Sequence, residues 1–327
     1  MLFLKRNDLQ DMLDRLREKR SLMIALRVLQ VTFVTAVVVF LAGRLSDIGW
    51  SDVADALPTT PWYYIFFLGW FFAIPIAELF VYKLIWGENL TSRLGVFLRK
   101  RVYNYAVLSY SGEAYLAMWA RKAIPLDNRK ILSTVKDSTI LSGLASNTFT
   151  VLLLGVFLVT GQLAVLLEAD PDFEAYFIVA ALVGLILVPM ILRFRKSIIA
   201  LPGRLALQVF AIHMVRLILM LVLQTAMWAV VLPQVPFETW LMFLTAQLVL
   251  TRVPFLPNTD LMYLGLGLSL SGYLEAPEAT VAGMFLAAGA LSQILNVAIY
   301  GLTSFRQFMP APIKPPKGGR VVPAKGT

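Results

Sequence analysis

The stretch best suited to chemistry is an apolar segment, residues 99–122, that carries polar side chains in its middle. It reads RKRVYNYAVLSYSGEAYLAMWARK and contains Asn104 and Gly112 followed by Glu113, with basic residues at both ends. An ionisable side chain at membrane depth is unfavourable unless it is paired or hydrated, so these residues are candidates for substrate binding or translocation. The alternative for Glu113 is a structural role at the end of a helix.

Arg216 is a further candidate for substrate binding because of its depth in an apolar run. It lies about twelve residues, or about 18 Å by helix rise, from the cytoplasmic end of that run. This is too deep for the side chain to reach the interface, so Arg216 requires an acidic partner. The available acids are Glu78, Glu113 and Asp260. Two roles are open for Arg216: it forms a buried structural ion pair, or it contacts the phosphate of a lipid headgroup.

Four other polar residues fall in apolar surroundings. Asp260 follows Asn258 in a stretch broken by prolines and glycines. The two residues are candidates for substrate binding, and the alternative for Asp260 is to cap the next helix. His213 lies three residues before Arg216 on the same helix face. Its role is either that of a proton relay or that of a packing residue. Glu78, near the end of its expected span, either joins that relay or reaches the interface.

The remaining chemistry is limited by what the chain lacks. It has no cysteine and a single histidine, which leaves no zinc or haem ligand set, and we predict no metal and no cofactor. There is no G-x-x-x-x-G-K-[ST] loop for ATP, no HExxH and no GxSxG. The sequence therefore predicts no catalytic residue and no enzyme activity.

Composition assigns these residues to a membrane protein. Of 327 residues, 58% are hydrophobic and 15% are charged, too apolar a balance for a soluble domain. We expect an all-α polytopic helical bundle with about eight spans, a re-entrant hairpin near residues 102–120 and a broken helix near 253–275. The expected continuous spans are residues 24–43, 62–82, 139–161, 175–192, 205–232, 239–251 and 279–303.

Three regions follow from this pattern. Residues 1–23 are expected to form a cytoplasmic amphipathic segment, either on an anionic membrane surface or in solvent. Residues 24–306 form the transmembrane domain. Residues 307–327, rich in proline and lysine, are expected to be a disordered cytoplasmic tail.

The basic residues fix the expected orientation. With the N-terminus in the cytoplasm and eight crossings, 27 of the 29 Lys and Arg lie on the cytoplasmic side, all but Arg44 and Arg216. This distribution explains the net charge of +9 without a nucleic-acid partner. It holds only if residues 102–120 do not cross, because both flanks are basic. We therefore interpret the segment as a re-entrant hairpin, which protein or water must surround.

Two motifs resemble the flippase-like family typified by the transmembrane region of lysylphosphatidylglycerol synthetases. In that family an Asn precedes the Glu of a Gly-Glu pair by nine residues, as Asn104 precedes Glu113 here, and a basic pair follows. The second motif, a proline-glycine turn with an acidic residue, corresponds to the PNTD sequence that ends at Asp260. The proline and arginine usual between Asn and Gly-Glu are absent, as is the synthetase domain.

The resemblance implies a lipid translocase-like protein of the bacterial cytoplasmic (inner) membrane, multi-pass, with both termini in the cytoplasm. Its substrate would be a membrane lipid, either a phospholipid or a polyprenyl-linked lipid, moved or presented between leaflets without ATP. The alternative is a non-transporting scaffold or partner subunit that binds membrane proteins of cell-envelope lipid or polysaccharide synthesis. An intramembrane enzyme is the third possibility, with no motif to support it.

Overall fold

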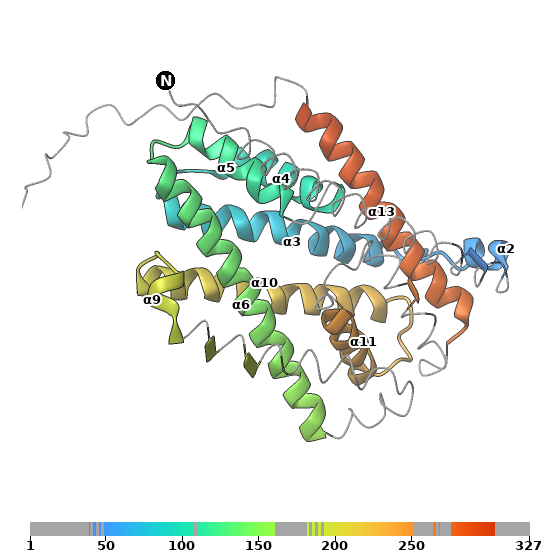
Figure 1. Cartoon of the computed structure of the whole chain (residues 1–327). Coiled ribbons are helices and arrows are strands. Elements are labelled where there is room, and N and C mark those ends of the chain that lie inside the picture. Colours follow the sequence, from blue (N-terminus) through green and yellow to red (C-terminus); the bar gives the residue numbers. More distant parts are fainter. Residues whose placement is uncertain are drawn as a thin grey trace, which may run out of the picture.

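The structure is a computed structural model that describes residues 49–106, 110–160, 193–250 and 276–304, with isolated positions in 39–46, 182–190 and 264–268. Its regular elements in these ranges are helices (Figure 1). They are α2 (Trp50–Asp55), α3 (Pro61–Trp86), the 3-10 helix η1 (Thr91–Arg93), α4 (Leu94–Ala106), α5 (Ser111–Ala123), α6 (Asn128–Thr160), α9 (Arg195–Ile198), α10 (Gly203–Ala229), α11 (Phe237–Leu250) and α13 (Glu278–Ser304).

Four of the described helices are long and apolar enough to cross a membrane: α3, α6, α10 and α13. The expected all-α, multi-pass class is confirmed to that extent, and eight spans are not shown. The predicted span at 239–251 corresponds to α11, whose 14 residues cover about 21 Å. The expected spans at 24–43 and 175–192 and the broken helix near 253–275 lie almost entirely outside the described residues. Residues 1–23 and 307–327 lie wholly outside them.

The stretch predicted to be a re-entrant hairpin contains two short helices, α4 and α5, of 13 residues each, and its placement in a membrane stays a prediction. At 1.5 Å per residue each is about 20 Å long, short of the roughly 30 Å of a hydrocarbon core. The two run antiparallel, since the start of α5 contacts the end of α4 and Tyr115 reaches back to Arg99. The observed hairpin runs from 94 to 123, so the predicted bounds of 102–120 were too narrow. Residues 99–101 therefore belong to α4 and do not flank it.

Two large hydrophobic clusters hold the bundle together, one toward each end, and a small third cluster joins α6 to α10. The first joins the early part of α3 to α11, α13 and the end of α10, and includes Phe71 and Trp228. The second joins the end of α3 to α4, α5 and the start of α6 and α10, and includes Leu79 and Leu116. Between Phe71 and Leu79 of α3 the core changes from one cluster to the other.

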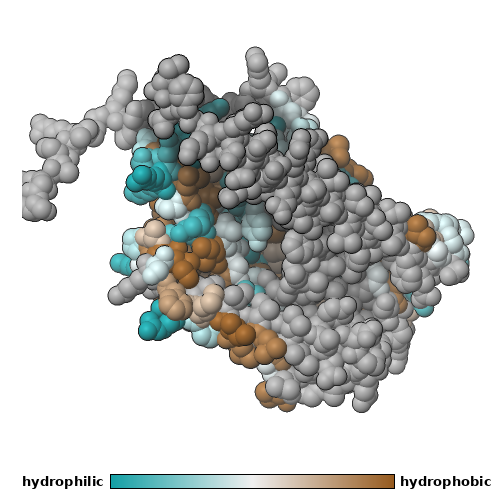
Figure 2. All heavy atoms as spheres, viewed as in Figure 1, coloured by the Kyte–Doolittle hydropathy of each residue, from teal (hydrophilic) through white to brown (hydrophobic). Residues whose placement is uncertain are grey.

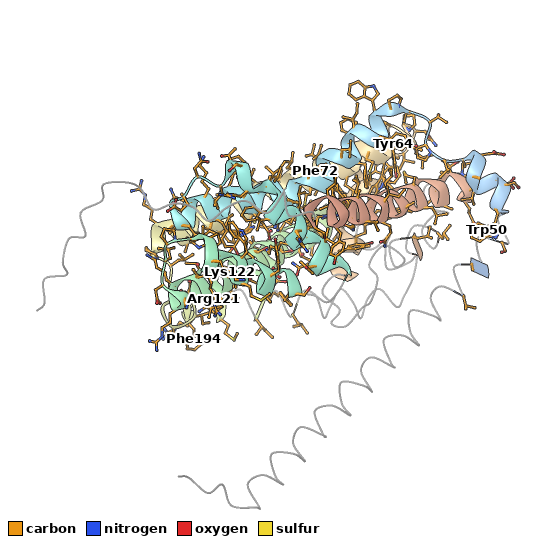
Figure 3. All side chains as sticks on the ribbon, turned by 90° about the horizontal axis from the view of Figure 1, so that it is seen from above. Trp50, Tyr64, Phe72, Arg121, Lys122 and Phe194 are labelled. Atoms are coloured by element: carbon orange, nitrogen blue, oxygen red, sulfur yellow. The ribbon has the colours of Figure 1, made fainter. Side chains whose placement is uncertain are left out.

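Apolar side chains also cover the outside of the long helices, as expected for contact with lipid. Ile65 on α3, Val215 on α10 and Val297 on α13 are all more than half exposed, and Figure 2 shows hydrophobic residues at the surface of the described part. Basic residues mark one end: Arg121 and Lys122 lie at the opposite end of the molecule from Trp50 of α2 (Figure 3). This separation fits helices that connect two different membrane faces.

The turn before α10 is held by a buried carboxylate. Asp137 of α6 has no exposed surface, and its Oδ2 accepts the backbone N–H groups of Ala200 and Leu201 at 2.8 and 2.9 Å. Lys136 donates to the carbonyl of Ile198 at 2.6 Å. These bonds satisfy backbone groups that precede α10, so Asp137 fixes where α10 starts relative to α6.

Candidate functional site

The centre of the candidate site is an ion cluster formed by Glu78, Lys100 and Glu113. These residues come from α3, α4 and α5 respectively. The Lys100 ammonium contacts the Glu78 carboxylate directly and lies 3.1 Å from Glu113 Oε1. Lys100 is only 3% exposed, and the two carboxylate side chains are 13% and 18% exposed. One buried cation is therefore shared by two acids from neighbouring helices.

The hairpin positions Glu113 through the two other residues of the predicted motif. Gly112 N–H donates to Asn104 Oδ1 at 2.7 Å, so the asparagine satisfies one of the free N–H groups at the start of α5. Ser111 Oγ donates to the carbonyl of Tyr103 at 2.7 Å. The nine-residue spacing between Asn104 and Glu113 thus joins the end of one helix to the first turn of the next.

Gly112 is required by the closeness of the two helices. A Cβ at this position would overlap the carbonyl oxygen of Lys100 and lie 2.8 Å from Asn104 Cγ and Oδ1. Only glycine allows this approach, and it brings Glu113 within reach of Lys100.

Glu113 has the helix-end position that its sequence allowed, and its role in substrate binding stays a prediction. It lies in the first turn of α5, where the helix dipole favours a negative charge. Its Oε1 is paired with Lys100, whereas its Oε2 is buried and has no hydrogen-bond partner among the described residues. The ion pair with Lys100 therefore accounts for one carboxylate oxygen and leaves the other able to accept a hydrogen bond.

Two carboxylates lie next to the buried Lys100 amine. Negative charge this close favours the ammonium form of a lysine and offsets the cost of its burial.

Arg216 is not paired with either of the two described acids that its depth suggested, and the third, Asp260, lies outside the described residues. Its Nη2 donates to Ser142 Oγ of α6 at 3.4 Å, and its Nε is buried without a partner in the described ranges. Neither Glu78 nor Glu113 forms an ion pair with it, so the predicted pairing with these acids is wrong. Lys100 is closer to both carboxylates and neutralises them instead. Glu78 still acts on Arg216 electrostatically from α3.

Of the two predicted relay residues, Glu78 belongs to this cluster and His213 lies close to it. His213 is 1% exposed, and neither ring nitrogen has a hydrogen-bond partner in the part of the chain that is described. It lies within electrostatic reach of Arg216 and Lys100. Glu78 lies about 12 Å before the end of α3 by helix rise, and its ion pair with Lys100 replaces the expected reach to the interface. The proton relay itself stays a prediction.

Lys100 is the site residue that the sequence reading missed. It was counted with Arg99 and Arg101 as a cytoplasmic flank. The available signal was its spacing: Lys100 precedes Asn104 by four residues and so lies on the same helix face. The neighbouring arginines also turn inward. Arg101 stacks over Phe71 at 4.0 Å.

Arg99 fastens the hairpin to the last helix. Its guanidinium lies 5.5 to 5.7 Å from the ring centres of Tyr103, Tyr115 and Tyr300, and it donates to the carbonyl of Thr303 at 2.8 Å. Each cation–π contact contributes about 0.5–1 kcal/mol at a partly exposed site. Together they couple α4 and α5 to α13.

The second predicted motif cannot be placed. Asn258 and Asp260 lie outside the described residues, so their relation to the cluster stays a prediction. Within the described ranges, no group of His, Asp or Glu residues is arranged to hold a metal ion.

No family model, no curated protein and no solved structure matches this chain. The fold and site define an α-helical protein with four candidate membrane spans and a buried ion cluster. The resemblance to the flippase-like family stays a prediction from two short motifs.

Proposed function

We propose that this protein is a multi-pass membrane protein that moves or presents a lipid headgroup between leaflets without ATP, with α4 and α5 as a re-entrant hairpin. The observation that carries the proposal is the Glu78–Lys100–Glu113 cluster. It lies where two helices too short to span a membrane pack against helices long enough to do so. Half-length helices that bring charge to membrane depth are typical of transporters.

The energetics of the cluster support a role beyond stability. Burying an ion pair costs several kcal/mol per ion in desolvation, and well-packed apolar residues of similar volume stabilise a fold as well or better. A chain that is 58% hydrophobic has no shortage of such residues. The charges are therefore better explained by a polar group that the site must receive.

The unpaired atoms indicate which group that would be. Arg216 Nε is a buried donor without a partner, and Glu113 Oε2 is a buried acceptor without one, among the described residues. A phosphate fits the guanidinium and an ammonium fits the carboxylate. A phospholipid headgroup carrying both charges would complement the two atoms and keep the site neutral.

The same cluster supports a second candidate, a non-transporting scaffold in a cell-envelope synthesis complex. Lys100 already neutralises both acids, and Arg99 fastens the hairpin to α13, so the arrangement is well braced without a substrate. Lipid exchange distinguishes the two candidates, because only the first requires it.

Reconstituted protein is expected to exchange acyl-chain-labelled phosphatidylethanolamine, which keeps its free ammonium, between leaflets, and Glu113→Gln is expected to slow this exchange at least tenfold. The substitution keeps the shape of the side chain but removes the charge that would attract an ammonium, and tenfold corresponds to about 1.4 kcal/mol. The measurement is reduction of the labelled lipid by an impermeant reagent outside the vesicles.

The matched control is Glu238→Gln, an exposed carboxylate in the first turn of α11, which is expected to exchange lipid at the wild-type rate. Wild-type exchange no faster than that of empty vesicles would reject the translocase and favour the scaffold.

The hairpin placement predicts that both of its ends face the same side of the membrane. The chain has no native cysteine, so single cysteines report directly: Thr91→Cys, before α4, and Lys122→Cys, near the end of α5, are both at exposed positions. Each is expected to react with an impermeant maleimide from the cytoplasmic side only, because α4 and α5 do not cross. Ser51→Cys in α2, at the other end of α3, is expected to react from the opposite side. Labelling of Thr91→Cys and Lys122→Cys from opposite sides would contradict the hairpin placement.

A further inference from the structure

A second polar site lies in the bundle, lined by α3, α10, α11 and α13 in the described structure. The cavity has a volume of about 30 Å³. The whole empty space between these helices, including the open mouth of the cavity, is about 380 Å³. Its apolar wall contains Trp228 and Phe285. The polar residues that line it are Trp70, Gln224, Gln247 and Ser292.

These polar side chains leave two hydrogen-bond donors unused. Gln224 donates to Gln247 Oε1 at 2.8 Å, which satisfies the acceptor of Gln247. Gln247 is 4% exposed, and its Nε2 has no partner among the described residues. The indole N–H of Trp70 is also buried and unpaired there. A buried donor without an acceptor costs about 1–3 kcal/mol, so two in one cavity indicate a missing acceptor.

The lining also limits what the acceptor can be. No charged side chain of the described residues lines the cavity, so a phosphate or carboxylate would be buried there without a counter-charge. An ammonium has no lone pair to accept from Trp70 or Gln247. A hydroxyl oxygen accepts from both donors and can give its own proton to Ser292 Oγ. The room for one water-sized group fits a single hydroxyl.

We propose that this cavity is a binding site for one hydroxyl oxygen, supplied either by the glycerol or sugar headgroup of an uncharged lipid or by water. The site is independent of the ion cluster and of lipid exchange. Its ligand is recognised by hydrogen bonds to two neutral donors, whereas the cluster recognises charge.

The test uses the full-length protein, with ¹⁵N-labelled tryptophan indoles, in phosphatidylcholine nanodiscs. The Trp70 indole signal is assigned by its loss in Trp70→Phe. We expect this signal to show a cross-peak to water, or to shift saturably when dioctanoylglycerol, which has one free hydroxyl, is added. Trioctanoylglycerol, which has none, is expected to leave it unchanged.

Trp240 is the matched internal control. Its indole nitrogen is also buried without a partner among the described residues, but Trp240 does not line the cavity. Its signal is therefore expected to show neither water nor lipid contact. Displacement of the water cross-peak by dioctanoylglycerol identifies a lipid hydroxyl as the ligand, and a persistent water cross-peak identifies water. A Trp70 signal with no water contact and no response to dioctanoylglycerol overturns the proposal.

A double variant removes the Gln247 donor without leaving its hydrogen-bond partner Gln224 buried and unpaired. Gln224→Leu with Gln247→Leu removes both amides together, which is far less disruptive than removing one. We expect the response of Trp70 to be lost while the Trp240 signal keeps its position, which shows that the bundle is intact. An unchanged Trp70 response in this variant would also overturn the site, because Gln247 would then not hold the ligand.

Discussion

Lys100→Met is expected to destabilise the folded protein by about 3–5 kcal/mol, as removal of one partner from a buried ion pair does. Methionine has no charge, so Glu78 and Glu113 lose the ammonium that they share. Both carboxylates then stay largely buried without a cation. The measurement is unfolding by sodium dodecyl sulfate in mixed micelles, followed by circular dichroism.

Two comparisons identify the cause of this loss. Lys130→Met removes an exposed lysine of α6 and is expected to change stability by less than about 0.5 kcal/mol. Adding Glu78→Gln and Glu113→Gln to Lys100→Met is expected to restore most of the stability, since no uncompensated charge remains. A triple variant as unstable as the single one would show that packing of the lysine stem, and not the charges, holds the three helices together.

Gly112→Ala is expected to destabilise the protein by about 3 kcal/mol, at the upper end of the effect of overpacking. The added methyl group would overlap the backbone carbonyl of Lys100, which cannot move aside as a flexible side chain would. The hairpin must open, and the hydrogen bond from Gly112 N–H to Asn104 lengthens with it. The same unfolding titration measures this loss.

Gly143→Ala in α6 provides the matched control, because a Cβ there meets nothing within 4 Å. Alanine is favoured over glycine in a helix by about 1 kcal/mol, so this variant is expected to be as stable as the wild type or slightly more. Equal losses for the two variants would mean that the close approach of α4 and α5 is not what requires glycine at 112.

The local features of the hairpin could be predicted from the sequence, because they depend on neighbours in the chain. The basic residues on both flanks predicted that residues 102–120 reverse direction, and α4 and α5 do so. The spacing of Asn104, Gly112 and Glu113 marked the contact between the two helices. Composition alone predicted the long apolar helices, of which α3, α6, α10 and α13 are described as candidate spans.

The pairing of charges could not be predicted in the same way. Glu78 and Lys100 are 22 residues apart on different helices, and which faces of α3 and α4 meet is decided by packing across the whole bundle. Counting Lys100 as a solvated flank was reasonable from charge alone and wrong in three dimensions. The depth of Arg216 predicts an acidic partner, but Lys100 already neutralises two of the three available acids, Glu78 and Glu113. The role of Asp137 could not be predicted because its hydrogen-bond donors are backbone N–H groups more than 60 residues away, which have no sequence signature.

The length of α4 and α5 has a consequence for the bilayer itself. In the proposed placement, two helices of 13 residues end about 10 Å short of the far side of a hydrocarbon core about 30 Å thick. Such hydrophobic mismatch is relieved when the membrane thins locally and its lipids tilt toward the short element. A headgroup at the tip of the hairpin would therefore have a thinner apolar barrier to cross than one beside the long helices α3, α6, α10 and α13.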